Sequence, residues 1–373
     1  MQKSLKMSAP CILGIEGILA EELRNLGADN VAAQNGKVNF EGNFNILAKA
    51  NISSRYAERI HIVLGSFKAL SFEELFENVK KIPWENFIGK NDCFPVKGFS
   101  LNSKLHSVPD CQAIIKKSIV NRLKTCYKEE WFKETGSLYQ IKFSIMKDQV
   151  DIMIDSTGTG LHKRGYRPDA NEAPIKETLA AAMAYLAHVK HYSTVIDPFC
   201  GSGTILIESA MLALNIAPGL RRTFVSETWA NIDKNIWTEE RALAVSQIRK
   251  DTEFKAVGYD NNERSVHLSK LNIKRAGLDK KIEIIEKDFN DFKCDEEKAI
   301  IICNPPYGER MLELKEAENI YKLMGEKFIK RKGLSYYIIN PHEDFESLYG
   351  CKADRRRKLY NGMIKCQLYM YFK

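Results

Sequence analysis

The sequence predicts an α/β protein whose second half is a doubly wound domain on a mostly parallel sheet. Short, almost wholly apolar runs alternate with helical segments after residue 164, at residues 194–199, 256–260, 282–288, 299–304 and 336–340. Strands that are apolar on both faces are typical of a parallel sheet covered by helices on each side. The last run, residues 364–372, alternates apolar with polar side chains, which predicts an antiparallel strand at the end of that sheet.

Length and composition set the outer limits. The 373 residues predict two or three domains at roughly 150 residues each. A content of 44% hydrophobic and 28% charged residues excludes a disordered or fibrous protein, and no apolar stretch approaches the ~20 residues that span a bilayer. Nine scattered cysteines without a CxxC pair predict reduced thiols in a cytoplasmic protein and no metal site. The net charge of +8 permits a nucleic-acid partner without requiring one.

The first 65 residues predict a small α+β domain of ferredoxin-like type. Residues 16–27 have the apolar spacing of a helix, and the glycine at its end stops it. A strand is expected at 36–42, a helix at 43–50 and another strand near 59–64. Alternating units of this size favour an α+β arrangement.

Residues 66–164 repeat this pattern, with a helix expected at 72–81, a strand at 94–101 and a hairpin formed by 139–145 and 150–155. A long helix from residue 110 or 111 carries four cations, Lys116, Lys117, Arg122 and Lys124. From the charges alone, these are a solvated helix face. The third region, residues 165–373, is the doubly wound domain.

The first motif of that domain is DPFCGSGT at residues 197–204, a turn between a strand and a helix. Gly201 and Gly203 allow the backbone to approach a ligand, and the free N–H groups of the helix point to the same place. The third glycine of a dinucleotide fingerprint is missing, because residue 206 is Leu. Asp197, just before the turn, suits a ligand with an ammonium group better than a pyrophosphate.

Two more carboxylates follow at the ends of the next strands. Asp260 ends the second strand, where an acidic residue usually accepts hydrogen bonds from ribose hydroxyls. Its distance in sequence from Asp197 requires an insertion, placed at about 217–252. Asp288 and Phe289 follow the third strand and offer an acceptor for an adenine amine beside an aromatic ring. Three carboxylates at successive strand ends predict one shared binding site.

The motif NPPY at residues 304–307 directly follows the fourth strand. The Asn304 side-chain oxygen and the Pro305 carbonyl can accept hydrogen bonds from both hydrogens of a planar amine, while Pro305 and Pro306 fix the backbone. Tyr307 offers a ring on which a base can stack. The lone pair of such an amine is delocalised into the ring, which makes the nitrogen a poor nucleophile. Bending the amine out of the plane of the ring localises the lone pair on the nitrogen, so orientation can promote transfer of a methyl group to it.

The two motifs together resemble S-adenosylmethionine-dependent amino-methyltransferases that act on nucleobases. Three segments, RGYRPD at 164–169, APIKETLA at 173–180 and NPPYGER at 304–310, narrow the resemblance to the RlmL-type 23S rRNA guanine-N2 methyltransferases, which are often labelled N6-adenine-specific DNA methylases. The resemblance covers nearly the whole chain. It implies a Rossmann-like class I methyltransferase domain at residues 165–373, and an RNA-binding THUMP domain at residues 66–164 before it. Known fusion enzymes of this type carry a second methyltransferase domain, which is absent here, so a single modification is expected.

The resemblance also implies roles for individual residues. Catalytic residues would be Asn304, Pro305, Pro306 and Tyr307. The S-adenosyl-L-methionine site would comprise Asp197, Phe199, Cys200, Gly201, Ser202, Gly203, Thr204, Asp260, Asp288, Phe289, Pro174 and Thr178. RNA contacts would come from Lys116, Lys117, Arg122 and Lys124. Apart from the resemblance, Arg355, Arg356 and Arg357 lie before the final strands and near the predicted mouth of the site, so we expect them to contact the substrate RNA as well.

Several functions remain open at this point. The favoured function is methylation of guanine N2 in 23S rRNA. Methylation of adenine N6 in DNA or RNA is the nearest alternative, because the same motif can hold either amine, and a tRNA guanine is a third target. A non-catalytic RNA-binding assembly factor is a fourth reading, which an intact NPPY motif disfavours. The sequence does not specify the oligomeric state.

Overall fold

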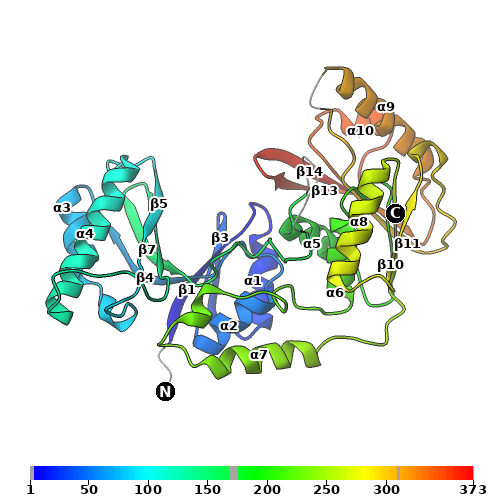
Figure 1. The fold of residues 1–373 in the computed structure, drawn as a ribbon. Coiled ribbons are helices and arrows are strands. Elements are labelled where there is room, and N and C mark those ends of the chain that lie inside the picture. The colour runs from blue at the N-terminus through cyan, green and yellow to red at the C-terminus, as the bar shows by residue number, and fades with distance from the viewer. Residues whose placement is uncertain (1–3, 168–174, 309–310, 373) are drawn as a thin grey trace.

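The computed structural model describes residues 4–167, 175–308 and 311–372, and these form two seven-stranded sheets (Figure 1). The strands of the first sheet are β1 (Leu5–Pro10), β2 (Asp29–Gln34), β3 (Lys37–Gly42), β4 (His61–Lys68), β5 (Val96–Leu101), β6 (Gln140–Met146) and β7 (Gln149–Asp155). Its helices are α1 (Glu16–Asn25), α2 (Phe44–Ser53), α3 (Phe72–Lys81), the short η1 (Trp84–Asn86) and α4 (Val108–Tyr127). The predicted α+β character of the first half is confirmed.

The first sheet is continuous across the first two predicted regions. Its strand order is β2-β3-β1-β4-β7-β6-β5, and β4 pairs antiparallel with both β1 and β7. Residue 65, the predicted boundary, therefore lies inside β4. β1 and β2 do not appear among the sequence-based expectations; β2 is largely exposed and lies at the edge of the sheet.

The second sheet has the order β10-β9-β8-β11-β12-β14-β13. Its strands are β8 (Thr194–Asp197), β9 (Lys255–Asp260), β10 (Ile282–Glu286), β11 (Ala299–Cys303), β12 (Leu334–Asn340), β13 (Arg355–Asn361) and β14 (Ile364–Tyr371). The first five are parallel and β14 is antiparallel, as predicted. The prediction that residues 364–372 form the last strand of the sheet was wrong, because β13 pairs with the outer side of β14 and forms the edge.

The helices of the second half are α5 (Glu177–Leu186), α6 (Thr204–Ala213), α7 (Lys234–Ser246), α8 (Glu263–Ala276), α9 (Met311–Lys327) and α10 (Phe345–Tyr349), with short turns η2 (Val225–Thr228) and η3 (Phe289–Asp291). Local signals set several helix ends. The Asn262 side chain accepts the N–H of Ser265 and begins α8, and Gly277, at φ +72°, ends it. α8 thereby packs beside β9 and β10 and supports the strand ends that carry the site.

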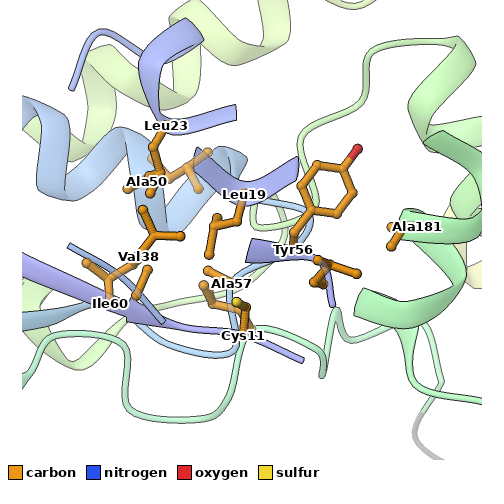
Figure 2. Close-up of a cluster of buried hydrophobic side chains, with 14 of the residues drawn as sticks. Cys11, Leu19, Leu23, Val38, Ala50, Tyr56, Ala57, Ile60 and Ala181 are labelled. Carbon is orange, nitrogen blue, oxygen red and sulfur yellow. The ribbon is translucent and has the colours of Figure 1, made fainter. Parts of the chain in front are cut away.

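A continuous apolar core joins the two halves. Figure 2 shows Cys11, Val38 and Ile60 packed near Leu19 of α1, with Tyr56 lying between this cluster and Ala181 of α5. These side chains belong to one buried cluster that extends into the second half as far as β14. Burying a Leu such as Leu19, which is fully buried, contributes roughly 1.5–3 kcal/mol. The core therefore restrains the position of the second half relative to the first.

The predicted insertion, residues 217–252, adds a second link. Its helix α7 packs against α2 of the first half, as Figure 1 also shows. The Trp229 ring stacks on Tyr139 with centroids 4.6 Å apart, and its indole N–H donates to the Leu138 carbonyl at 2.9 Å. The insertion thus packs against the first half of the chain and adds to the contacts between the two halves.

Candidate functional site

The carboxyl ends of β8, β9, β10 and β11 surround a cavity of about 1010 Å³. Parallel strands of a doubly wound sheet bring their C-terminal residues to one edge, where such folds bind ligands. Most of the predicted site residues line this cavity: Asp197, Phe199, Cys200, Gly201, Ser202, Thr204, Asp260, Asp288, Phe289, Asn304, Pro305, Pro306 and Tyr307. The three carboxylates and the NPPY motif therefore share one site.

The glycine turn after β8 brings backbone to the cavity wall. Gly201 has φ +51° and Gly203 has φ +78°, a conformation that L side chains rarely adopt. Gly203 is the N-cap of α6, and a Cβ there would lie 3.3 Å from the Ser269 side chain. Gly203 thus supports the turn without lining the cavity. Cys200 lines the cavity with a neutral thiol, because burial raises its pKa well above the usual value.

Asp197 and Asp260 form the acidic floor of the cavity. The Asp197 carboxylate is 1% exposed and accepts the Phe199 N–H at 3.0 Å. Burial raises its pKa to about 8, and the nearby negative charge of Asp260 adds to this shift. Asp260 accepts the Gly201 N–H at 2.9 Å and the Asn262 N–H at 3.0 Å, which ties the end of β9 to the turn. The floor can receive a cationic group and hydroxyl donors.

The end of β10 contributes Asp288 and Phe289. Asp288 accepts the backbone N–H of Asn290 at 2.7 Å, and this bond, with the amides of Asn261 and Asn290, lowers the pKa of its carboxyl. Phe289 is buried against Phe199, with ring centroids 4.6 Å apart. An ionised acceptor beside an aromatic wall fits the predicted contact with a planar heterocycle.

The NPPY segment closes the opposite side. The Tyr307 hydroxyl donates to the Asn304 Oδ1 at 2.5 Å, and the Asn361 amide lies 3.4 Å from the Tyr307 oxygen. Burial raises the pKa of Tyr307, so its hydroxyl stays a neutral donor. The Pro306 carbonyl accepts the Tyr321 hydroxyl at 2.8 Å, whereas no described residue donates to the Pro305 carbonyl. Asn304 Oδ1 keeps a second lone pair, so it and the Pro305 carbonyl can hold an amine.

The segment before α5 supports the turn from behind. Arg167 donates to the Thr204 hydroxyl at 2.7 Å and pairs with Glu177 at 3.0 Å. Of the two residues predicted here, Pro174 lies outside the described residues. Thr178 does not line the cavity; its hydroxyl donates to Glu58 at 2.7 Å.

The cations predicted to contact RNA on α4 are mostly engaged within the protein. Lys116 pairs with Glu134 at 2.6 Å, Arg122 with Glu85 at 2.5 Å and Lys124 with Glu130 at 2.7 Å. Lys117 is exposed, and no ion pair involves it in the described part of the chain. Their contact with RNA stays a prediction.

The three arginines before the last hairpin turn lie on β13. Arg355 lies over the Phe372 ring at 6.0 Å, Arg356 pairs with Glu346 at 3.3 Å, and Arg357 donates to the Gly14 carbonyl at 2.7 Å. Arg357 therefore joins the edge of the second sheet to the loop after β1. Their role in RNA binding stays a prediction as well.

Several cavity residues did not emerge from the sequence. Asn319, Ile320 and Leu323 come from α9, and Asn361 and Ile364 from the ends of β13 and β14. The pair Asn361–Gly362 is a hairpin signal that could have located the turn. The positions on α9 carry no such signal.

Neither a metal-binding cluster nor a membrane-spanning helix occurs among the described residues. No group of three or more His, Cys, Asp or Glu side chains there could hold a metal ion. Likewise, no helix in that part of the chain is long and apolar enough to cross a membrane.

Three family models match the chain. The RMKL-like methyltransferase domain matches residues 164–370, the RlmL ferredoxin-like domain matches 6–61 and the THUMP domain matches 69–155. These matches agree with the fold expected from the sequence.

Individual relatives agree with the family models. "Putative RNA methyltransferase YpsC" of Bacillus subtilis is 45% identical over 99% of this chain and 96% of its own length. "Ribosomal RNA large subunit methyltransferase K/L" of Psychromonas ingrahamii is 32% identical over 97% of this chain, which spans only 49% of that relative. A solved structure titled "SMU.472, a putative methyltransferase complexed with SAH" is 41% identical, with a TM-score of 0.95 over 100% of this chain and 99% of that one.

Proposed function

The chain belongs to the RMKL-like methyltransferases, S-adenosyl-L-methionine-dependent enzymes of RNA, and from this membership we propose that it methylates the N2 amine of a guanine in 23S rRNA. The observation that carries the proposal is the placement of Asn304 and the Pro305 carbonyl. Both open into the same cavity as Asp197 and Asp260. Acceptors for an amine and carboxylates for a cationic ligand thus lie together at one edge of the sheet.

The cavity fits the cofactor by its size and by its donor set. A volume of about 1010 Å³ holds a nucleoside cofactor together with a base. The buried Asp197 suits the ammonium end of an amino acid. Asp260 would accept the ribose hydroxyls, and Asp288 with Phe289 would receive the adenine. When bound, the cofactor supplies an electrophilic methyl group.

The protein's own contribution is orientation. Asn304 Oδ1 and the Pro305 carbonyl accept the two N–H groups of the target amine, which turns the nitrogen lone pair away from the plane of the base. The Tyr307 hydroxyl, 2.5 Å from Asn304 Oδ1, holds the acceptor in place while its ring faces the base. Held in this geometry, the amine becomes a nucleophile without a change in its protonation before attack.

The choice of substrate rests on the accessory region and the relatives. The THUMP match at 69–155 favours RNA over DNA, and the K/L relatives are named for the large ribosomal subunit. Because this chain spans about half of those relatives, the 23S rRNA target and guanine N2 are proposals for it.

The test compares modified nucleosides from a strain that lacks the gene with those of its parent. Mass spectrometry of 23S rRNA, tRNA and DNA nucleosides is expected to show loss of N2-methylguanosine from 23S rRNA alone. The intact chain should restore it, and the Asn304→Ala variant should not. Unchanged rRNA with N6-methyladenine lost from DNA, or N2-methylguanosine lost from tRNA, would overturn the proposal.

A further inference from the structure

The hairpin of β13 and β14 ends at the rim of the cavity. Asn361 and Ile364, the last and first residues of the two strands, both line the cavity. The Asn361 amide also lies 3.4 Å from the Tyr307 hydroxyl, so the tip is positioned by a residue of the amine site. In Figure 1 the hairpin, coloured red, projects from the edge of the second sheet toward the first half of the chain. Anything that enters the cavity from this side meets the tip.

The tip presents a large apolar side chain to solvent. Asn361 pairs with Ile364, so Gly362 and Met363 form a two-residue turn, with Gly362 at φ +63°. The first turn position requires glycine, whereas the second is usually polar and has no need of a long apolar residue. Met363 is nevertheless 97% exposed, the most exposed of the large hydrophobic side chains described. Its side chain therefore contributes nothing to the core and is available to a partner.

The outward face of the same hairpin is basic and carries an aromatic ring. Leu359 and Cys366 are buried on the inner face, so the alternate residues Lys358, Tyr360 and Lys365 point outward. Lys358 and Lys365 are exposed, and the Lys358 ammonium lies 5.3 Å from the Tyr360 ring. Two cations beside a ring match a nucleic-acid strand, whose phosphates need positive charge and whose bases stack on aromatic faces.

A buried amine site requires a displaced base. Asn304 and Pro305 lie within the cavity, so a guanine that is stacked in a helix cannot reach them and must first turn out of the stack. Turning a base out costs stacking energy, and proteins that open a stack often fill the gap with an apolar side chain such as Met.

We propose that Met363 enters the RNA base stack at the position that the target guanine leaves, while Lys358 and Lys365 contact the phosphates beside it. This role rests on the proposed function. The hairpin lies on the route to the cavity, is charged to suit RNA and carries an apolar tip that the fold does not use. Met363 is a positioning residue, because it acts on the neighbours of the target rather than on the reacting atoms.

The test measures methyl transfer to two forms of 23S rRNA from a strain lacking the gene. One form is folded with Mg²⁺, and the other is hydrolysed by alkali to short single strands. Met363→Ala should lower the rate on folded RNA about tenfold and leave the rate on the fragments within about twofold, because fragments need no opened stack. Met363→Leu should restore the rate on folded RNA, since it restores apolar volume.

A matched control is Ile329→Ala, which removes another exposed apolar side chain. Ile329 is 66% exposed, and its carbonyl accepts the hydroxyl of Tyr336, which pairs with Tyr371 at the end of β14 away from the hairpin turn. It should change neither rate. A double variant, Lys358→Ala with Lys365→Ala, should raise KM for both RNA forms while kcat on the fragments holds. Equal rates for Met363→Ala and the intact chain on folded RNA would overturn the role of Met363 alone. If the intact chain methylates neither RNA form, the proposed function fails and this role fails with it.

Discussion

The carboxyl of Asp197 should link cofactor binding to pH. It ends β8 with 1% exposure, and burial raises its pKa to about 8, so at pH 7 most molecules of the ligand-free protein carry it protonated. A ligand with an ammonium group binds best to the ionised form. Binding should therefore release a proton, and affinity should rise about tenfold for each pH unit up to about pH 8.

The same shift predicts a cost in stability. The pKa of Asp197 rises from 3.8, its ordinary value, to about 8 in the folded protein, a shift of roughly four units. At about 1.36 kcal/mol per unit, ionisation of this carboxyl lowers the free energy of unfolding by at most about 6 kcal/mol. Because the folded pKa is the higher one, the folded state binds the extra proton between these values. The contribution to stability is therefore intact below pH 4 and is lost as the pH rises to 8. Asp197→Asn cannot ionise, so it should be more stable than the native chain at pH 8 and should bind the cofactor poorly.

Isothermal titration calorimetry with S-adenosylhomocysteine, between pH 6 and 8.5 and in two buffers of different ionisation enthalpy, measures both affinity and proton release. Thermal unfolding of the ligand-free protein over the same range measures the cost. In Asp197→Asn both pH dependences should be strongly reduced. An affinity independent of pH, with no proton released on binding, would refute the reasoning, because the carboxyl would then already be ionised.

Four further substitutions test other parts of the protein. Asn304→Ala should abolish turnover and leave cofactor affinity, measured by calorimetry, within about tenfold; complete loss of binding would contradict its assignment to the amine. Tyr307→Phe removes the hydroxyl that holds Asn304, so kcat should fall about fivefold, equivalent to roughly 1 kcal/mol, with cofactor affinity unchanged. Arg167→Met leaves the buried Glu177 unpaired and should lower the free energy of unfolding in urea by roughly 3–5 kcal/mol. Trp229→Ala removes the stack on Tyr139 and should cost about 3–5 kcal/mol by the same measurement, without changing cofactor affinity.

The parts of the fold that could be predicted are those in which burial imposes a local pattern. β8 and β11 are short apolar strands buried on both faces, so their runs stand out, and the turn at Gly201 and Gly203 needs glycine. β13 gave no such signal, because it is an edge strand that begins with three arginines and buries Leu359 alone. A run of cations is typical of a solvated loop as much as of an exposed edge.

The candidate site also has parts that the sequence predicts and parts that it does not. Asp197, Asp260 and Asn304 directly follow or end strands, so the rule that parallel strands end at one edge was enough to bring them together. The contact of Arg167 with Thr204 joins residues 37 positions apart through polar atoms, and such contacts leave no periodicity in the sequence. The function of the insertion was likewise hidden, because it depends on where α2 lies.

The buried contacts between the two halves affect how an RNA can bind to both of them. Arg164 is buried, donates to the Leu161 carbonyl at 2.7 Å and to the Arg55 carbonyl at 2.5 Å, and lies 3.5 Å from the buried Glu208 of α6. Breaking a buried charge pair of this kind costs several kcal/mol, and the Trp229 stack would be lost as well if the halves separated. These contacts restrain the first sheet relative to the cavity. An RNA that contacts both the first sheet and the cavity would therefore have to adapt its own shape to them, and a side chain that lowers the cost of opening the base stack would favour that adaptation.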